Sequence, residues 1–475
     1  MLFRYVLILL ALVPVLTFAQ PGGGPPTTFF HKDTLKISAN AVGVRFSHMT
    51  TPMMLTGKQW DVIDLGSDGA PGKTVTVYLA NDSIQIRNDN FPFEEKHYFP
   101  LELAGRKYKL RLRFNSVPAF FPADYIRENR GRALVEIPET FELANILLLL
   151  SPTGPKKGSM IETGPYHEEV MAHFKSYLGH PVFKALDVPE VGYVHNYYEF
   201  RENSMCYQFS GDKLVPTPYF FVYGSDDSTF SNAFRNNIGL VEDFAKTSKF
   251  REFYQKHLPY YRKLITRQAE WSDVPGMQRW LSKEFARKGF DTSKLIFSPI
   301  IYSRHSTQQF AGSDENRRSF EEMLLFVNGP EVYTTQPELN DQQRRGLLSG
   351  TIFTEVDHNY VNPRTADFAL SIDSIFADRD FWAPVSKSGF YTTPVAVFNE
   401  YMTHALFSLY ALDTFDEPTA KFLIARRETM NAENRGFVKF REFNTALIKL
   451  KKENADKTVA ALYPKIVGWC REFAR

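Results

Sequence analysis

Apolar and polar side chains alternate along much of the first quarter of this chain. In residues 108–114, tyrosine, leucine and phenylalanine occupy every second position, with lysine or arginine between them. Such a period of two is typical of a strand with one buried face. Residues 74–78 and 83–87 alternate in the same way, with an Asn-Asp turn between them. The pattern predicts a small antiparallel β module over residues 32–118.

Beyond residue 130 the spacing of apolar positions becomes helical. Residues 139–150, 166–178 and 233–285 carry apolar and aromatic side chains three or four positions apart, as on one face of a helix. Pro259 and Pro275 interrupt the longest of these segments. Because proline lacks the N–H that a helix interior needs, both residues predict breaks between separate helices.

A short sheet and further helices follow. The apolar runs 294–303 and 320–327 have the composition of buried strands. Helical patterns then cover 341–360 and 394–412, and three more helices are predicted before the C-terminus. The order of β module, helices, short sheet and helices predicts an α+β protein whose mainly helical body spans residues 130–475.

The chain begins with the three-part pattern of a secretory signal peptide. Arg4 supplies the positive charge, an apolar run follows from residue 5 to residue 16, and Ala19 ends a small-residue cleavage site. A membrane anchor would need about 20 apolar residues, whereas this run is shorter and contains Pro14. We therefore predict that residues 1–19 are removed on export.

Several features of the remaining chain narrow its class. Residues 20–31 form a Pro/Gly-rich linker, and no later stretch is apolar and long enough to predict a transmembrane helix. The predicted location is the periplasm, the cell envelope or the exterior. With 56 Lys and Arg against 54 Asp and Glu, the net charge of +2 lacks the basic excess of a nucleic-acid binder.

Cys206 and Cys470 form either one disulfide or two buried thiols, and the sequence leaves both alternatives open.

The segment 350–363, GTIFTEVDHNYVNP, has the chemistry of a site. Glu355 and His358 are three residues apart, so on a helix they share one face. Zinc peptidases of the HExxH type place two histidines four residues apart, with a glutamate after the first as general base. Aligned to that motif, the segment has the glutamate and the second histidine, but Thr354 replaces the first histidine.

A second pair lies on the next strong helical pattern. Glu400 and His404 are four residues apart and therefore share a face. The gluzincin class of zinc peptidases takes its third zinc ligand from a glutamate about one helix downstream of the motif. Glu400 is at the corresponding position.

Four segments together resemble an uncharacterised family of exported bacterial proteins, a domain of unknown function with a gluzincin-like helix. They are ALVEIPETFELANILLLL, SKFREFYQKHLPYYRKLI, TEVDHNYVNP and NEYMTHA, and the resemblance covers roughly residues 130 to 460. It implies a zincin-like body in which Glu355 is the general base and His358 and Glu400 are zinc ligands. Thr354 departs from this pattern.

A replacement for the missing histidine ligand has to come from outside the motif. We favour His305, because it follows the predicted strand 294–303 in a polar loop, where functional residues tend to lie. His404 is the alternative, although it can instead orient Glu400. Asp357 is a neighbour that can orient His358.

Two functions remain open on these residues. The first is an exported zinc-dependent hydrolase acting on peptide bonds, with zinc activating water and Glu355 accepting its proton. The second is a metal-free, inactive peptidase-like scaffold that binds a peptide or protein or associates with the envelope. Thr354 favours the scaffold, whereas the joint presence of Glu355, His358 and Glu400 favours the hydrolase.

Signal cleavage gives the first testable prediction. We expect the exported protein to begin at Gln20, because Ala19 is the small residue before the cleaved bond. Intact-mass analysis of protein recovered from the envelope or medium measures this directly. Recovery of an exported chain that still carries Met1 would contradict it.

Overall fold

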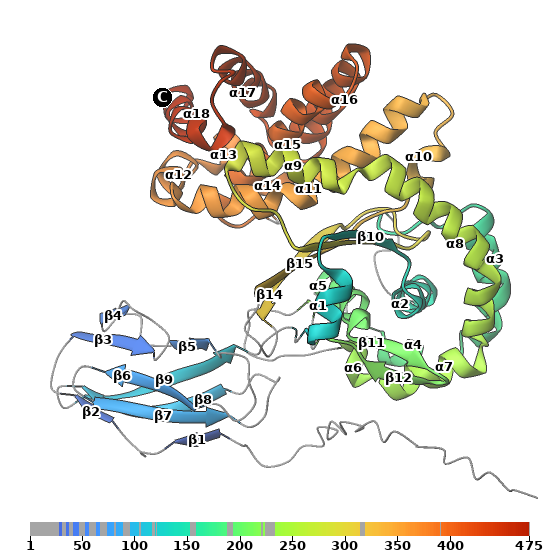
Figure 1. Cartoon of the computed structure of the whole chain (residues 1–475), viewed down its shortest axis with the longest axis horizontal. Helices are drawn as coiled ribbons and strands as arrows, with labels where there is room; N and C mark the ends of the chain where they lie inside the picture. The colour runs from blue at the N-terminus through green and yellow to red at the C-terminus, as the bar shows by residue number, and fades with distance from the viewer. Residues whose placement is uncertain are drawn as a thin grey trace, which may run out of the picture. The chain divides into compact units, whose positions relative to one another are not determined.

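The structure is a computed structural model in which the chain forms two compact units, Met1–Val117 and Pro118–Arg475 (Figure 1). In the second unit the described residues are 119, 121–152, 158–187, 193–219, 222–223, 233–313, 319–389 and 391–474. In the first unit only the backbone of the strands is described. The predicted signal peptide lies outside the described residues, and so does the predicted linker, residues 20–31, except for strand β1 at Thr28–Phe30.

The first unit contains strands in two sheets, ordered β1-β7-β6-β3-β4 and β2-β8-β9-β5. These strands are β1 Thr28–Phe30, β2 Leu35–Ile37, β3 Ala41–Phe46, β4 Met53–Thr56, β5 Ile63–Gly66, β6 Thr74–Leu79, β7 Asp82–Asn88, β8 Lys96–Leu103 and β9 Arg106–Asn115. The side chains that would build the core of the predicted β module lie outside the described residues. That module therefore stays a prediction.

The second unit contains a small mixed sheet and a separate antiparallel strand pair, β11–β12. The sheet has the order β10-β13-β15-β14, in which β10, β13 and β15 are parallel and the edge strand β14 is antiparallel. The strands are β10 Arg132–Glu136, β11 Tyr207–Ser210, β12 Lys213–Pro216, β13 Thr292–Ile296, β14 Ser306–Ser313 and β15 Ser319–Phe326.

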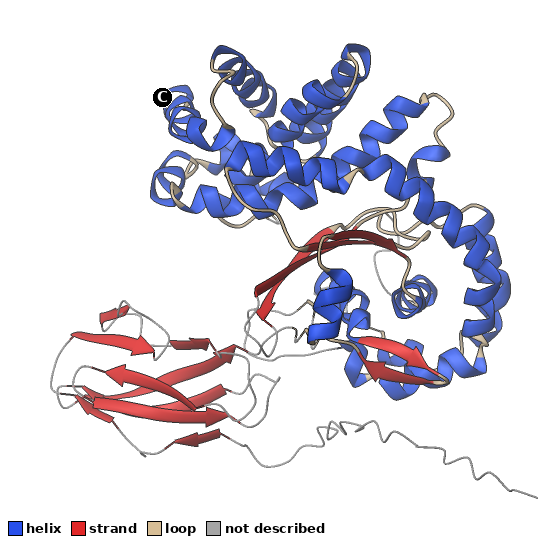
Figure 2. Cartoon of the chain, in the orientation of Figure 1, coloured by secondary structure: helices blue, strands red, loops and turns tan. Residues whose placement is uncertain are grey.

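Helices form most of the second unit, as the blue ribbons of Figure 2 show. They are α1 Ala123–Asn129, α2 Glu139–Leu150, α3 Pro165–Phe174, α4 Pro181–Ala185, α5 Tyr193–Asn203, α6 Ala233–Asn236, α7 Ile238–Thr247, α8 Phe250–Ser272, α9 Val274–Phe285, α10 Glu331–Thr334, α11 Asp341–Ala366, α12 Ala369–Ile375, α13 Arg379–Trp382, α14 Val385–Ser388, α15 Pro394–Thr414, α16 Glu417–Thr429, α17 Phe440–Glu453 and α18 Val459–Phe473. A mainly helical body with a short sheet is thus confirmed.

Two strand predictions need correction. The strand predicted over 294–303 ends at Ile296, because Pro299 cannot donate to a ladder and the chain turns there. Beyond the turn, Ile301 forms an isolated bridge with Met160. The sheet also includes β10 and β14, which the apolar pattern does not predict, so it has four strands rather than two.

The predicted break at Pro259 is wrong. Helix α8 runs through this proline without interruption. The predicted break at Pro275 is confirmed, because α8 ends at Ser272 and Pro275 lies in the first turn of α9. The helical segment is divided at Lys249 and Asp273, whose φ angles of 54° and 40° lie in the left-handed region. The side chain of Asp273 then caps α9 by accepting a hydrogen bond from the backbone N–H of Gly276 at 3.1 Å.

Helix α11 also runs through a proline, beyond its predicted end at residue 360. Pro363 leaves the carbonyl of Asn359 without its helical donor. Arg287 supplies the missing hydrogen bond, with its Nη1 atom 2.8 Å from that carbonyl oxygen. A long-range donor therefore replaces the N–H that proline lacks, and the helix continues to Ala366.

Helix α18 uses the same arrangement at Pro464. The acceptor left without a helical donor is the carbonyl of Ala460. The Nη2 atom of Arg364 donates to this oxygen at 3.0 Å. Because Arg364 belongs to the last turn of α11, the bond also ties α18 to that helix.

The mixed sheet separates two hydrophobic cores. Side chains alternate between the faces of a strand, so Met323 and Leu325 of β15 join the core on the face that α11 covers. Leu324 and Phe326 join the second core with Phe121 and residues of α1. Figure 1 shows α11 and α1 on opposite sides of the sheet.

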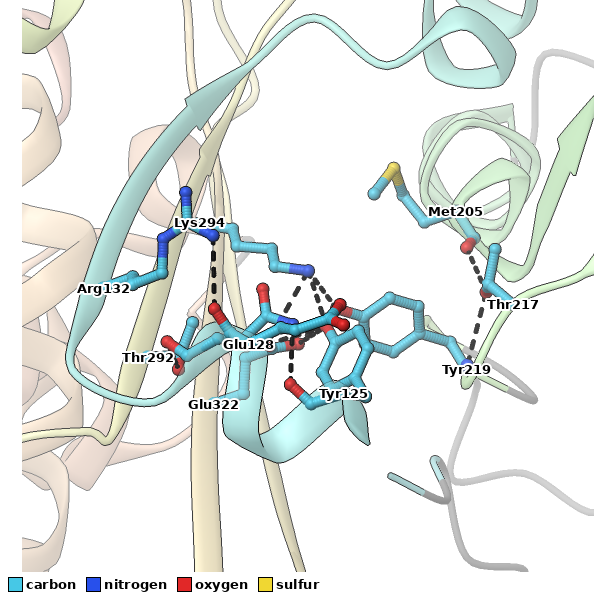
Figure 3. Close-up of polar contacts among 10 residues, drawn as sticks. Tyr125, Glu128, Arg132, Met205, Thr217, Tyr219, Thr292, Lys294 and Glu322 are labelled. Carbon is cyan, nitrogen blue, oxygen red and sulfur yellow. Dashed lines mark hydrogen bonds and ion pairs between the residues drawn. The ribbon is translucent and has the colours of Figure 1, made fainter. Parts of the chain in front are cut away.

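A buried polar network lies on the α1 face of the sheet (Figure 3). The Nζ atom of Lys294 donates to the hydroxyl of Tyr125 at 2.5 Å and lies 3.8 Å from a carboxylate oxygen of Glu322. The hydroxyls of Tyr125 and Tyr219 both donate to Glu322. Burial raises the pKa of Glu322, and Lys294 and the two hydroxyls oppose that rise. The network joins β13, β15, α1 and the segment after β12.

Both cysteines are buried thiols, and no disulfide joins them. Cys206 ends the short 3₁₀ turn after α5, and Cys470 lies in the last turns of α18. Burial raises the pKa of the Cys470 thiol, which therefore stays protonated at neutral pH. Of the two alternatives that the sequence leaves open, the structure has two buried thiols.

Loss of the buried lysine should destabilise the second unit strongly. Lys294→Met leaves the carboxylate of Glu322, which is fully buried, without its cation. Breaking a buried ion pair in this way costs about 3–5 kcal/mol. Urea unfolding followed by circular dichroism should show this loss, and adding Glu322→Gln should recover part of it.

Lys288→Met is the matched control for the lysine substitution. Lys288 pairs with Asp291 at 3.2 Å, but its side chain is 78% exposed. Exposed ion pairs contribute about 0–1 kcal/mol. If both lysine variants unfold at the urea concentration of the native chain, the buried network does not hold the sheet to α1.

Candidate functional site

The predicted site residues lie on α11 and α15, which pack against each other. A capping box starts α11, with the Asn340 side chain accepting from the N–H of Gln343 at 2.9 Å and the Gln343 side chain accepting in return. Pro394 is the first residue of α15, and the side chain of Thr393 caps it by accepting from Ala396 at 3.1 Å. Local sequence thus sets where both helices begin.

Glu400 of α15 is the centre of a polar cluster that joins the two helices. One of its carboxylate oxygens lies 3.5 Å from Nε2 of His358, across on α11. Its other oxygen lies 2.8 Å from Nη2 of Arg435 and 3.5 Å from Nε2 of His404. The same Arg435 nitrogen donates to the hydroxyl of Tyr391. We call these five residues the Glu400 cluster.

Two guanidinium groups meet at the imidazole of His404. Nη1 of Arg427 lies 3.0 Å from Nδ1 of the ring, and Nη1 of Arg435 contacts Nε2. Burial, with the two arginines, holds the pKa of His404 well below its usual range, so the ring is neutral. A neutral imidazole accepts only one hydrogen bond. One of the two guanidinium groups therefore faces a ring N–H rather than an acceptor.

Glu355 lies half-buried beside the Glu400 cluster on α11. Burial raises the pKa of its carboxyl to about 7, with further increases from Glu400 and Glu202. The charges of His358 and Arg435 oppose this rise. A carboxyl with a pKa near 7 exists in both protonation states at neutral pH, so it can accept or donate a proton.

Asp357 and Thr354 are buried neighbours of Glu355 and His358 on α11. Asp357 is fully buried, its carboxylate oxygens have no hydrogen-bond partner among the described residues, and burial raises its pKa well above the usual range. The nearby Thr403 hydroxyl opposes that rise. The hydroxyl of Thr354 donates to the carbonyl of Thr351 at 2.9 Å, back along its own helix.

His358 takes its orientation from its own helix. Its Nδ1 atom lies 3.3 Å from the side-chain oxygen of Asn362, one turn further along α11. No hydrogen bond joins Asp357 to His358 among the described residues. Asn362 thus directs Nε2 of the ring towards Glu400.

His305 belongs to a neighbouring group of residues, before the start of β14. Burial and the charge of Arg201 lower its pKa to about 3, so the ring is neutral. Its Nε2 atom is buried without a hydrogen-bond partner. Within the described part of the chain, no hydrogen bond or ion pair joins His305 to His358 or Glu400. Whether His305 serves as a further ligand of the Glu400 cluster stays a prediction.

The donors of the Glu400 cluster do not fit a zinc ion as they are arranged. Glu400 is already paired with a guanidinium, and both ring nitrogens of His404 face guanidinium N–H groups. A dication would lie beside two arginines, whose charges oppose it. Within the described ranges, no three histidine, cysteine or acidic side chains are placed to hold a metal. Zinc binding therefore stays a prediction.

Sequence reasoning missed Arg427, Arg435 and Tyr391. Arg435 follows directly after a π-helical turn, Met430–Asn434, which extends α16 and changes the direction of the side chains beyond it. Neither arginine has a motif spacing to Glu400. The one signal in the sequence is Gly350, which leaves room on α11 for the guanidinium of Arg427.

No family model, curated protein or solved structure matches the chain. The function is therefore inferred from the geometry of the cluster.

The raised pKa of Glu355 predicts a pH-dependent stability difference. In the folded chain its pKa is about 7, above the ordinary value of 4.5, so protonation favours folding and this stabilisation is lost as the pH rises through 7. Glu355→Gln keeps a neutral side chain at all pH values. The free energy of unfolding of this variant should equal that of the native chain at about pH 4 and exceed it at about pH 8.

Urea titrations of both chains at the two pH values measure this difference. Glu338→Gln, at an exposed position just before α11, controls for the loss of one negative charge. If Glu355→Gln is less stable than the native chain at the higher pH, the carboxyl is ionised and stabilised there. The inferred environment of Glu355 would then be wrong.

Proposed function

We propose that this chain is an exported, metal-free scaffold with a zincin-like body that binds a peptide or protein ligand at the Glu400 cluster. The observation that carries the proposal is the guanidinium of Arg435 between Glu400, His404 and Tyr391. It supplies the positive charge that a metal ion would supply to the same carboxylate and imidazole. Catalytic zinc sites need three protein ligands, whereas these donors are engaged by arginine.

Exposure of the cluster supports binding at this place. The side chains of His358 and Arg435 are 21% and 28% exposed, so both reach solvent. Glu355 beside them is half-buried. Hydrogen-bond donors and acceptors thus lie together at a surface formed by rigid helices, which suits recognition of a polar chain such as a peptide.

Export is part of the proposal and rests on the signal-peptide pattern of residues 1–19. Among the described helices, none combines the length and the apolar character needed to cross a bilayer. The resemblance to exported bacterial proteins points in the same direction.

A second candidate function, a metal-dependent hydrolase, is favoured by one observation. Glu355 has a pKa of about 7 and lies beside His358, which faces Glu400 at 3.5 Å. A proton-transferring group would need such a pKa. The hydrolase would require Arg435 to move away from Glu400 and His404.

Metal analysis separates the two functions. We expect the full chain, purified without a chelating tag, to contain far less than one zinc per molecule and to show no heat of binding when zinc is added. Near-stoichiometric zinc in the native chain would favour the hydrolase and contradict the scaffold.

A double variant tests whether Arg435 prevents zinc from binding to Glu400 and His404. Thr354→His restores the missing histidine of the motif, and Arg435→Ala frees Glu400 and His404. Together they should create a zinc site, with binding detected by calorimetry, whereas Thr354→His alone should bind zinc weakly. Equal zinc binding by the single and double variants would show that Arg435 does not exclude the metal.

A further inference from the structure

Arg427 reaches the polar cluster by crossing α11 at a glycine. Its guanidinium packs 4.6 Å from the ring centre of Phe407 and lies over Gly350. A Cβ atom at residue 350 would lie only 2.3 Å from Nη2 of Arg427 and 2.8 Å from the Phe407 ring. The guanidinium can occupy this position because Gly350 has no side chain.

The guanidinium of Arg427 forms no ion pair within the described part of the chain. It donates a hydrogen bond to the neutral ring of His404, and Glu400 pairs with Arg435 instead. Burial lowers the pKa of Arg427 to about 10, so it remains charged at neutral pH. Asp357 is a neighbour, but its carboxylate oxygens make no hydrogen bond to the guanidinium. Burying a charge that forms no ion pair costs free energy. Binding of an anion at Arg427 would reduce that cost.

Two hydroxyl groups lie next to this charge. Tyr333 of α10 and Thr351 of α11 are joined by a hydrogen bond of 2.9 Å between their hydroxyl oxygens. Thr351 directly follows Gly350, over which the guanidinium lies. Burial raises the pKa of Tyr333, and the nearby charge of Arg427 opposes that rise. Because one of the two hydroxyls donates to the other, one hydroxyl proton of the pair remains to donate to an anion at the guanidinium.

We propose that Arg427, with the hydroxyls of Tyr333 and Thr351, binds the carboxylate of the peptide ligand. This inference rests on the proposed function, because it names the group of the ligand that is recognised. A planar guanidinium binds a carboxylate through two parallel hydrogen bonds. The source is either the C-terminal carboxylate or an aspartate or glutamate side chain.

Charge favours a carboxylate over a phosphate at this place. Glu400 is a neighbour on α15, and Glu355 lies one turn beyond Thr351 on α11. Their negative charges would repel a dianion more strongly than a monoanion. A guanidinium without an ion-pair partner also balances a single negative charge, which is the charge of one carboxylate.

Three peptide probes test the inference on the full chain. They are N-acetyl-trialanine with a free C-terminus, the same peptide as its amide, and N-acetyl-Ala-Asp-Ala amide. Calorimetry at low salt should detect binding of the free acid, and Arg427→Gln should weaken it by about tenfold or more. Binding of the aspartate-containing amide, lost in the same variant, would identify a side-chain carboxylate as the source.

Matched variants separate the effect of losing the Arg427 charge from an effect on folding. Arg426→Gln removes a neighbouring exposed charge from the same helix and should leave binding unchanged. Gly350→Ala should weaken binding while keeping Arg427, because the new methyl group displaces the guanidinium. Arg427→Gln should not lower the melting temperature, because it removes a charge that forms no ion pair.

The outcomes distinguish this inference from the proposed function. If the free acid and the amide bind the native chain equally, or Arg427→Gln leaves the affinity for the acid unchanged, the carboxylate site is wrong and peptide binding stands. If none of the three probes binds the native chain, both the proposed function and this inference are overturned.

Discussion

The guanidinium of Arg435 is held by three groups that lie 31 to 44 residues before it in the chain. It pairs with Glu400, contacts the ring of His404 and donates to Tyr391. Charge-assisted hydrogen bonds of this kind are among the stronger polar interactions in a protein. Arg435 therefore joins α15 to the chain that follows α16 through polar contacts, and its charge acts on every member of the cluster.

The electrostatic character of the cluster follows from that contact. Arg427 and Arg435 bring two positive charges, while burial keeps the His404 ring neutral and raises the pKa of the Asp357 carboxyl. Glu400 is paired with Arg435. Guanidinium groups thus occupy the donors of the cluster, the reverse of what a set of zinc ligands needs before the metal binds. An anionic ligand fits this arrangement better than a cation does.

Two proline-containing helices show how long-range contacts override a local rule. The patterns around Pro363 predict an end to the helix, and proline does remove a backbone donor. Arg287, far away in the sequence, donates to the carbonyl that Pro363 leaves free. The bond keeps α11 continuous, which lets its last turn carry Arg364 to α18.

The sequence by itself determined the local features of this protein. Periodicity predicted α2 and α15 almost to the residue, and helical spacing placed Glu355 with His358 and Glu400 with His404. These features depend on neighbours within one or two turns, which the order of residues specifies directly. Whether Glu400 faces His358 was a hypothesis until α11 and α15 were seen to pack together.

Only the tertiary structure decided which charges meet. Arg427 and Arg435 reach His404 because a π-helical turn, the packing of α16 and the space above Gly350 bring them there. The strands β10 and β14 likewise became part of the sheet through pairing with distant partners. The physical reason is the same in each case: such contacts join residues with no fixed spacing in the chain, so their energy depends on how whole elements pack.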